Sequence, residues 1–205
     1  MMGVKAYLKL TVRDREGRVV KHLEIESRSF LLNLIRVFKA LFARQHDMSV
    51  TLPDGGSGRF DAYCQVGAST KTTNWWCHLM APKEDDSYGI VVGLGTRAVA
   101  IDDYNLESKI PHGTTAGKLY YYDVKSEAVS VEGSVMKFKV KRFFDEHAGS
   151  SVNVNEVGLI AFHRCTDDNG DTQIKFLIAR DVLPSTVTVP AYGNLMVEYE
   201  IKCTV

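Results

Sequence analysis

The sequence predicts a mainly β fold, an antiparallel β-sandwich of jelly-roll-like type with one amphipathic α-helix near the N-terminus. Between Leu195 and Val205, apolar and polar residues alternate with the period of two that is typical of a strand with one buried face. Earlier ladders of the same kind are separated by turn signals such as Asn169-Gly170. Only one stretch of the chain shows convincing helical periodicity.

The length of 205 residues allows one large all-β domain or two small ones, and we expect a single β-sandwich domain over residues 1–205. The chain has 45% hydrophobic residues, and its 25 Lys and Arg balance its 25 Asp and Glu, so the formal charge is zero. We therefore expect no nucleic acid as the main ligand. We also expect no membrane association, because no stretch approaches the roughly 20 apolar residues that cross a bilayer. The N-terminus shows no export signal, and we expect the four cysteines to be reduced.

Residues 1–48 predict a hairpin followed by the helix. Apolar residues share one face from Val4 to Val12, a turn follows at Asp14–Gly17, and residues 19–25 run back. The next segment repeats large apolar residues at helical spacing, with Ser27 or Ser29 available as the N-cap. We expect this helix to be buried in the core; the alternative is a partner-binding or membrane-surface helix. The large apolar residues are Phe30, Leu31, Leu34, Ile35, Phe38, Leu41 and Phe42.

Residues 49–88 predict a long irregular loop region, because a glycine-rich break at 54–58 precedes a polar stretch around Trp75-Trp76. Long loops in compact domains usually bind something or fold against a neighbour. Trp75 and Trp76 are therefore interface candidates, together with Phe38 and Phe42 of the helix. The alternative role for the tryptophans is to close the end of the sandwich.

Residues 89–205 predict the main sheet. Within it, Met136, Phe138 and Val140 alternate with three lysines, so one face belongs to the core and the other forms a lysine row facing solvent. Residues 173–179 predict one strand, and the prolines at 184 and 190 bracket a separate short edge strand at Val187–Val189.

Every candidate nucleotide-binding, metal-binding or catalytic motif in the sequence lacks part of its required pattern. Gly93-Leu94-Gly95 lacks the dinucleotide spacing, and we expect a structural glycine turn there. The acidic stretch at 167–171 lacks the ligand spacing of a calcium loop and fits a hairpin turn. Asp102-Asp103 fits a solvated loop or a helix cap, and the Cys-His pairs at 77–78 and 163–165 lack further zinc ligands. We therefore expect no enzyme, no metal and no cofactor.

Four short motifs recur as an ordered set: Val92–Thr96 followed by Asp103–Glu107, Arg142–Phe144, Val152–Leu159, and Ala179–Val182. This set resembles a group of small structural proteins of tailed bacteriophages and archaeal tailed viruses that share the pattern VGxGT…DYxLE…RxF…VxEVGL…ARDV. The resemblance spans roughly the whole chain. It implies a virion component without a cofactor, on the capsid surface or in the tail or head–tail region.

One residue of this set has a physical interpretation of its own. Glu156 lies in a strongly apolar ladder, so its carboxylate needs backbone amides or a basic partner such as Arg142 or Arg180. We expect a structural ion pair among these residues.

Together, these observations predict a symmetric homo-oligomeric building block of a virus particle, made in the host cytoplasm. Its expected partners are copies of itself and other virion proteins, namely major capsid, tail or connector proteins. The alternative is a receptor- or carbohydrate-binding module on the virion exterior or tail tip, with Trp75, Trp76 and Tyr120–Tyr122 stacking on sugars.

Overall fold

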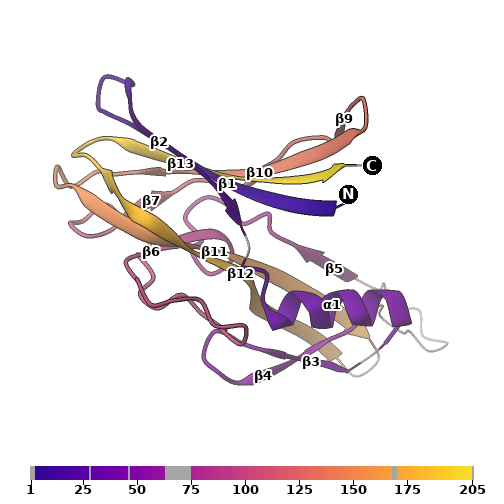
Figure 1. Cartoon of the computed structure of the whole chain (residues 1–205). Coiled ribbons are helices and arrows are strands. Elements are labelled where there is room, and N and C mark those ends of the chain that lie inside the picture. Colours follow the sequence, from indigo (N-terminus) through magenta and orange to yellow (C-terminus); the bar gives the residue numbers. More distant parts are fainter. Residues whose placement is uncertain (1–2, 28, 46, 63–74, 168–169, 205) are drawn as a thin grey trace.

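The computed structural model describes residues 3–27, 29–45, 47–62, 75–167 and 170–204 (Figure 1). The chain is mainly β, its named strands pair antiparallel, and the described residues contain one α-helix. The elements are β1 (Gly3–Arg13), β2 (Val19–Ser27), α1 (Leu32–Ala43), β3 (Met48–Thr51), β4 (Ser57–Phe60), β5 (Trp75–His78), β6 (Gly89–Gly93), β7 (Tyr120–Tyr121), β8 (Lys125–Ser126), β9 (Ser130–Glu132), β10 (Val135–Asp145), β11 (Val152–Asp167), β12 (Gly170–Val189) and β13 (Asn194–Thr204).

The larger sheet, sheet A, has the strand order β2-β1-β13-β10-β7, with β8 and β9 also pairing with β10. The predicted N-terminal hairpin is confirmed, because β1 and β2 pair antiparallel over residues 6–13 and 19–27. The alternation of β13 matches its burial at Leu195, Val197 and Tyr199, which are fully buried, but Glu198 and Glu200 of the other row are buried as well, beneath the lysines of the neighbouring strands. The three apolar side chains and those of β1 form one apolar face of the sheet.

Sheet B consists of β12 and β11, with β6 and β5 pairing one after the other along the other edge of β11. β12 is one strand of 20 residues, so the separate strands predicted at 173–179 and 187–189 are joined. The pairing of β11 with β12 is shifted between Val154 and Glu156, near the stretch of β12 that contains Pro184. Such a bulge lets the strand pass a proline, which cannot donate to the ladder. The pairing runs up to Asp167 and Gly170; Asn169 of the predicted turn lies outside the described residues.

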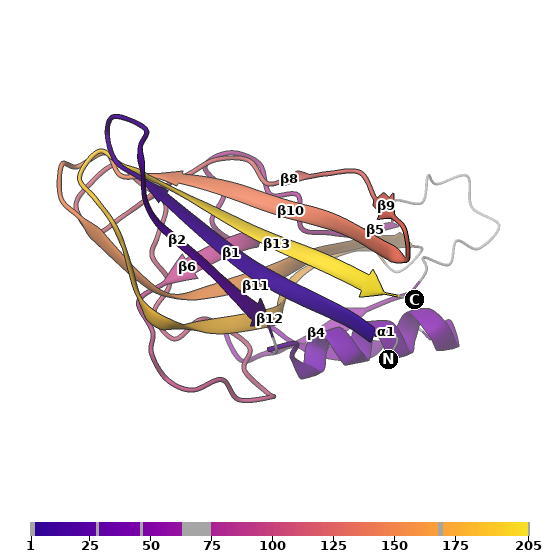
Figure 2. The same cartoon turned by 45° about the horizontal axis from the view of Figure 1, so that its top comes forward.

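The two sheets share one hydrophobic core. Leu8, Val197 and Phe144 of sheet A and Val157 and Leu177 of sheet B belong to the same cluster of buried side chains. Figure 2 shows the long strands of sheet A lying across those of sheet B. The chain passes from β10 in sheet A to β11 in sheet B and returns from β12 to β13, so the β10–β13 and β11–β12 pairs are connected at one end.

A second, smaller core lies on the opposite face of sheet B. Phe176 belongs to it, whereas the next residue, Leu177, belongs to the main core, because consecutive strand residues point to opposite faces. α1 and the β3–β4 hairpin cover this face through Val37, Ala40 and Phe60. The region 49–88, predicted to be irregular, therefore contains three short strands, β3 to β5.

Between β6 and β7, residues 94–119 form a long segment outside the named strands. It is fixed by buried side chains and by backbone bonds, because Leu106 and Ile110 belong to the main core and Leu94 N donates to Ser108 O at 2.7 Å. This segment contains the Asp103–Glu107 motif and borders the sites described next.

Candidate functional site

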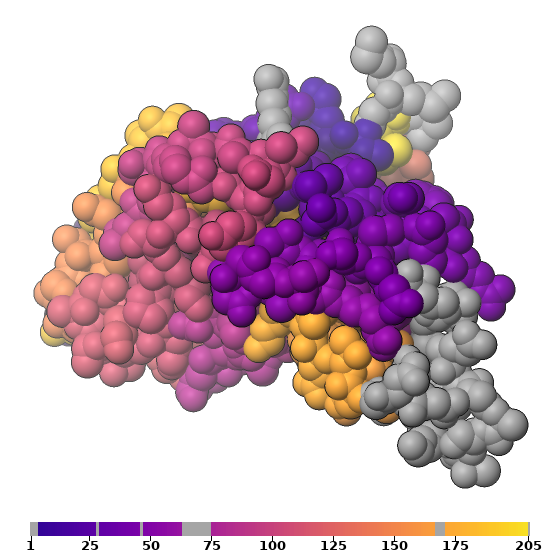
Figure 3. All heavy atoms as spheres, turned by 90° about the horizontal axis from the view of Figure 1, so that it is seen from below, coloured from indigo at the N-terminus to yellow at the C-terminus, as the bar shows by residue number. Residues whose placement is uncertain are grey.

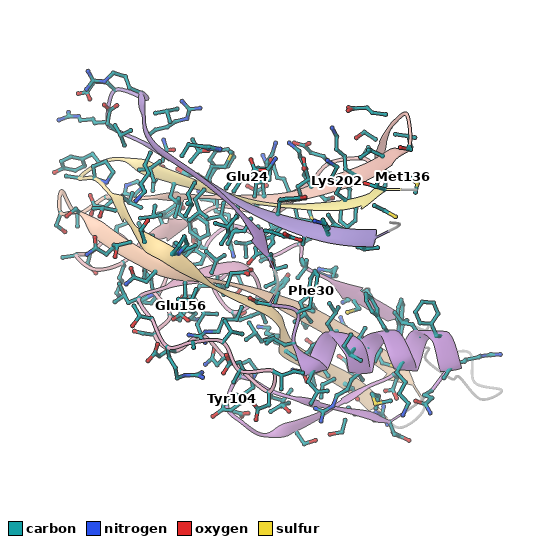
Figure 4. The ribbon with its side chains drawn as sticks, in the orientation of Figure 1. Glu24, Phe30, Tyr104, Met136, Glu156 and Lys202 are labelled. Carbon is teal, nitrogen blue, oxygen red and sulfur yellow. The ribbon has the colours of Figure 1, made fainter. Side chains whose placement is uncertain are left out.

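A buried cluster of charged groups joins the 94–119 segment to sheet B. Arg180 and Glu156 are fully buried, and Arg180 Nε lies 2.7 Å from Glu156 Oε2 (Figure 4 labels Glu156). Arg180 Nη1 also donates to Asp103 Oδ2 at 2.8 Å. The structure thus confirms the expected ion pair between Glu156 and Arg180 and shows that Asp103 is a second carboxylate partner of Arg180. The sequence placed Asp103 in a solvated loop or a cap, but it is buried and binds two arginines, Arg180 and Arg97.

The remaining lone pairs of Glu156 accept hydrogen bonds from the backbone. Its Oε1 accepts from the N–H of Gly95 at 3.0 Å and of Ser108 at 2.8 Å, and its Oε2 accepts from the N–H of Glu107 at 3.1 Å. A buried carboxylate with four donors is fully satisfied. The cluster therefore has a structural role: it holds both ends of the loop from 95 to 108 against β11.

Gly93 and Gly95 are required by close approach to this carboxylate. A Cβ atom on either residue would lie 2.5 Å from Glu156 Oε1, well inside van der Waals contact. The sequence predicted a glycine turn here, and the structure gives a more specific reason for both glycines. Residues of three of the four motifs thus meet at one place, namely Gly93, Gly95, Asp103, Glu107, Glu156 and Arg180.

Arg142 does not pair with Glu156, which corrects its place among the ion-pair candidates. It extends from β10 in the opposite sheet, and its guanidinium is buried against the ring of Tyr121, 4.7 Å from the ring centroid. All its hydrogen bonds within the described residues go to backbone carbonyl oxygens, because no carboxylate lies within reach there. These carbonyls belong to Tyr122 (2.6 Å), Tyr88 (3.2 Å), Ile90 (3.0 Å), Pro82 (3.2 Å) and Asp85 (2.5 Å).

Helix α1 packs on sheet B through one face but exposes most of its large apolar side chains, so the expectation of a core helix holds for that face alone. Its buried residues are Asn33, Val37 and Ala40, and its N-cap is Leu31 rather than Ser27 or Ser29. By contrast, Phe42 is 90% exposed, Ile35 58% and Phe38 46%. The side-chain amide of Asn33 donates hydrogen bonds to the carbonyl oxygens of Thr51 and Leu177. These two bonds fix the rotation of the helix about its own axis, so that its small residues face the rest of the protein.

The end of sheet A near the chain termini also carries exposed apolar side chains. Val4 is 68% exposed, and Met136 and Phe138 are 37% exposed although they continue the apolar rows of β1 and β10. Figures 1 and 2 place this end of the sheet and α1 at the same end of the molecule. We call the exposed apolar side chains of both elements the apolar end face; they are Val4, Ile35, Phe38, Leu41, Phe42, Met136 and Phe138.

The outer face of sheet A carries the predicted lysine row, and each of its three lysines pairs with a glutamate. Lys139 lies 3.1 Å from Glu198, and Lys141 lies 2.6 Å from Glu127. Lys137 pairs with Glu132 at 3.1 Å. This face is thus charge-balanced, and the apolar end face contrasts with it.

Trp75 and Trp76 lie on strand β5, where they pair with Cys165 and Arg164 of β11. Trp75 is partly exposed, and its indole Nε1 donates to Asp61 O at 2.7 Å. The Trp76 ring lies beneath the Arg164 guanidinium, 5.3 Å from its centroid. Both tryptophans are therefore anchored in the sheet, and Trp75 presents only part of its ring to a partner.

A cavity of about 740 Å³ opens along β12, the edge strand of sheet B, between the β3–β4 turn on one face of the sheet and residues 85–88 on the other. Its apolar lining contains Ile160, Phe162 and Ile174, and its rim contains polar side chains from the β3–β4 turn, the 94–119 segment and β12. Figure 3 views the side of the β3–β4 hairpin, where this purple region lies beside orange residues near the β11–β12 turn. Sequence reasoning missed this cavity because its walls come from segments far apart in the chain.

The thiol and imidazole groups form no reactive pair among the described residues. Burial raises the pKa of Cys77 to about 11, so this thiol stays protonated at neutral pH. Cys165 is disulfide-bonded, which corrects the expectation that it is reduced, whereas Cys77 and Cys203 are free; Cys64 lies outside the described residues.

His163 is buried beside Phe60, and burial lowers its pKa. The described residues contain no group of His, Cys, Asp and Glu placed to hold a metal ion.

Comparison with family models, curated proteins and solved structures finds no match to this chain. In the part of the chain that the structure describes, no helix has the length and apolar character needed to span a bilayer.

Proposed function

We propose that this protein is a non-enzymatic structural component of a tailed virus particle, on the capsid surface or in the tail or head–tail region. It acts through contacts with copies of itself and with neighbouring major capsid, tail or connector proteins. It is made in the host cytoplasm and resides in the virion. The resemblance of its motifs to virion proteins and the exposed apolar end face support this proposal.

We further propose that the scaffold is a β-sandwich of jelly-roll-like type. The β10–β13 pair in sheet A and the β11–β12 pair in sheet B have the connectivity of one long hairpin folded across the core. This is the arrangement that a jelly roll repeats. Such a rigid scaffold suits a particle protein, because its interfaces keep a fixed relative orientation.

The apolar end face is the observation that carries the functional proposal. Phe38 and Phe42 lie one helical turn apart, with ring centroids at 6.4 Å; Phe42 is almost fully exposed and Phe38 about half exposed. Burying a phenylalanine side chain contributes about 1.5–3 kcal/mol. Two such residues give a modest contact, and repetition around a symmetric particle multiplies it.

The test measures molar mass against protein concentration by size-exclusion chromatography with light scattering. We expect the wild-type chain to associate and the Phe38→Ser/Phe42→Ser double variant to stay monomeric with unchanged thermal stability. Val20→Ser is the matched control, because Val20 is an exposed apolar residue of β2 outside this face. A wild-type chain that stays monomeric at all concentrations and does not join purified particles would refute the proposal.

A further inference from the structure

The cavity on sheet B is bounded by three separate parts of the chain that are fixed to one another. In the β3–β4 turn, Leu52 N donates to Gly56 O at 2.9 Å, and a Cβ at Gly55 would lie 3.5 Å from the Tyr104 ring. Tyr104, labelled in Figure 4, thus packs the 94–119 segment onto this turn. On the other wall, Lys109 Nζ lies 3.0 Å from Asp86 Oδ1. The cavity is therefore formed in the protein without a ligand.

The cavity floor is apolar and partly aromatic. Phe162 and Tyr88 have ring centroids 5.2 Å apart, and the Lys175 ammonium lies 5.9 Å and 5.5 Å from these two centroids. Ile160 lies on the same face of sheet B as Phe162, whereas Ile174 lines the cavity from the opposite face, beside the β3–β4 turn. A floor of this kind suits the C–H face of a sugar ring, which packs on apolar and aromatic side chains.

The rim carries hydrogen-bonding groups with unused capacity. Asn105 uses its Oδ1 on the N–H of Leu106, and its amide NH₂ makes no hydrogen bond within the described residues. Gln173 donates to Asp171, which leaves its carbonyl oxygen without a partner among those residues. Lys175 donates to Ser87 Oγ, and no described carboxylate lies within 4.0 Å of its ammonium. Donors and acceptors are thus both available around the opening.

The charges of the rim balance, which selects the class of ligand. The lining residues include two carboxylates, Asp54 and Asp85, and two ammonium groups, Lys109 and Lys175, so their formal charges sum to zero. A phosphate-bearing ligand requires an excess of cationic donors, and this cavity has none. A volume of about 740 Å³ lies in the range of small-molecule sites.

We propose that this cavity binds a short neutral saccharide, with the sugar ring over Phe162 and its hydroxyl groups bonded to Asn105, Gln173 and Lys175. The inference is independent of the assembly proposal, because the cavity and the apolar end face share no residues. It moves saccharide recognition from Trp75 and Trp76 to a cavity that the sequence did not reveal.

The experiment titrates the full chain with galactose, glucose, mannose and their N-acetylamines at millimolar concentration, followed by ¹H–¹⁵N NMR. At least one sugar is expected to shift the amides of residues 160–162 and 173–175. The Asn105→Ala/Gln173→Ala double variant is expected to weaken binding by at least about tenfold, which corresponds to one lost hydrogen bond. Both side chains lie on the rim, so the variant should fold normally.

The controls separate the possible outcomes. Asn153→Ala removes an exposed amide of β11 away from the cavity and should leave binding unchanged. Trp75→Ala tests the tryptophans as the alternative sugar platform. The Phe38→Ser/Phe42→Ser variant should bind sugar like the wild-type chain, which keeps this test separate from that of assembly. Binding that Trp75→Ala abolishes and the cavity variant leaves intact, or no response to any of these sugars, would overturn the proposal.

Discussion

Replacing Glu156 by Gln tests the buried charge cluster with almost no change of shape. The carboxylate accepts four hydrogen bonds, two at each oxygen, from Gly95 and Ser108 and from Glu107 and Arg180. A Gln amide keeps one acceptor oxygen and turns an NH₂ group toward two of these donors. Two buried donors therefore lose their acceptor in either orientation of the amide.

The expected loss follows from these contacts. Each unsatisfied buried donor costs about 1–3 kcal/mol, and breaking a buried ion pair costs about 3–5 kcal/mol. Because these costs overlap, we expect Glu156→Gln to lower the free energy of unfolding by about 3–5 kcal/mol. With a urea m-value of about 2–3 kcal/mol per molar, the unfolding midpoint should fall by about 1–2.5 M.

Urea unfolding followed by circular dichroism measures this shift. Glu132→Gln is the matched control, because Glu132 makes a surface ion pair with Lys137 and such pairs contribute about 0–1 kcal/mol. A Glu156→Gln variant within about 1 kcal/mol of the wild-type chain, at an unchanged m-value, would show that the cluster does not hold the loop.

Three further variants test the packing of the same scaffold. Gly93→Ala, which places a methyl group against the Glu156 carboxylate, should lower the thermal midpoint more than Gly17→Ala in the exposed β1–β2 turn, where the methyl group meets open space and only the positive φ of 81° strains an alanine; equal effects would contradict the close approach. Arg142→Lys should destabilise by about 2–4 kcal/mol in urea, because an ammonium cannot reach five carbonyls in several directions; a loss under about 1 kcal/mol would contradict this. Burial raises the pKa of Asp181, so the folded protein binds the carboxyl proton more tightly than the unfolded chain does. The free energy of unfolding therefore falls as the pH rises from the pKa of the unfolded chain through the raised pKa of the folded protein. Asp181→Asn, measured by thermal unfolding from pH 4 to 8, should remove that fall and keep its oxygen facing Ser27 and Tyr199; an unchanged pH profile would contradict this.

The alternation of apolar and polar residues along the chain predicted individual strands and the hairpin between neighbouring strands. The strand at Asn194–Thr204 and the N-terminal hairpin were predicted correctly, because in each of them one row of alternating apolar side chains packs into the main core. The length of β12 was not predictable in this way, because Pro184 is a local signal for a strand end and only pairing with β11 carries the strand past it.

The features that depend on long-range contacts were harder to predict. Apolar spacing identified the helix, but its rotation is set by Asn33, which bonds carbonyls of β3 and β12. Asp103 resembled a loop carboxylate because its partner Arg180 is 77 residues away in the chain. The cavity likewise requires three segments whose proximity no local pattern indicates.

Hydrogen exchange of α1 in the assembled and the monomeric states tests the central claim most directly. If copies or neighbouring virion proteins cover the apolar end face, the amides of residues 34–43 should exchange more slowly in concentrated protein or on virus particles than in dilute monomer. Residues of the β1–β2 turn, outside this face, should exchange equally in both states. Unchanged exchange of the helix in an assembled sample would contradict the account.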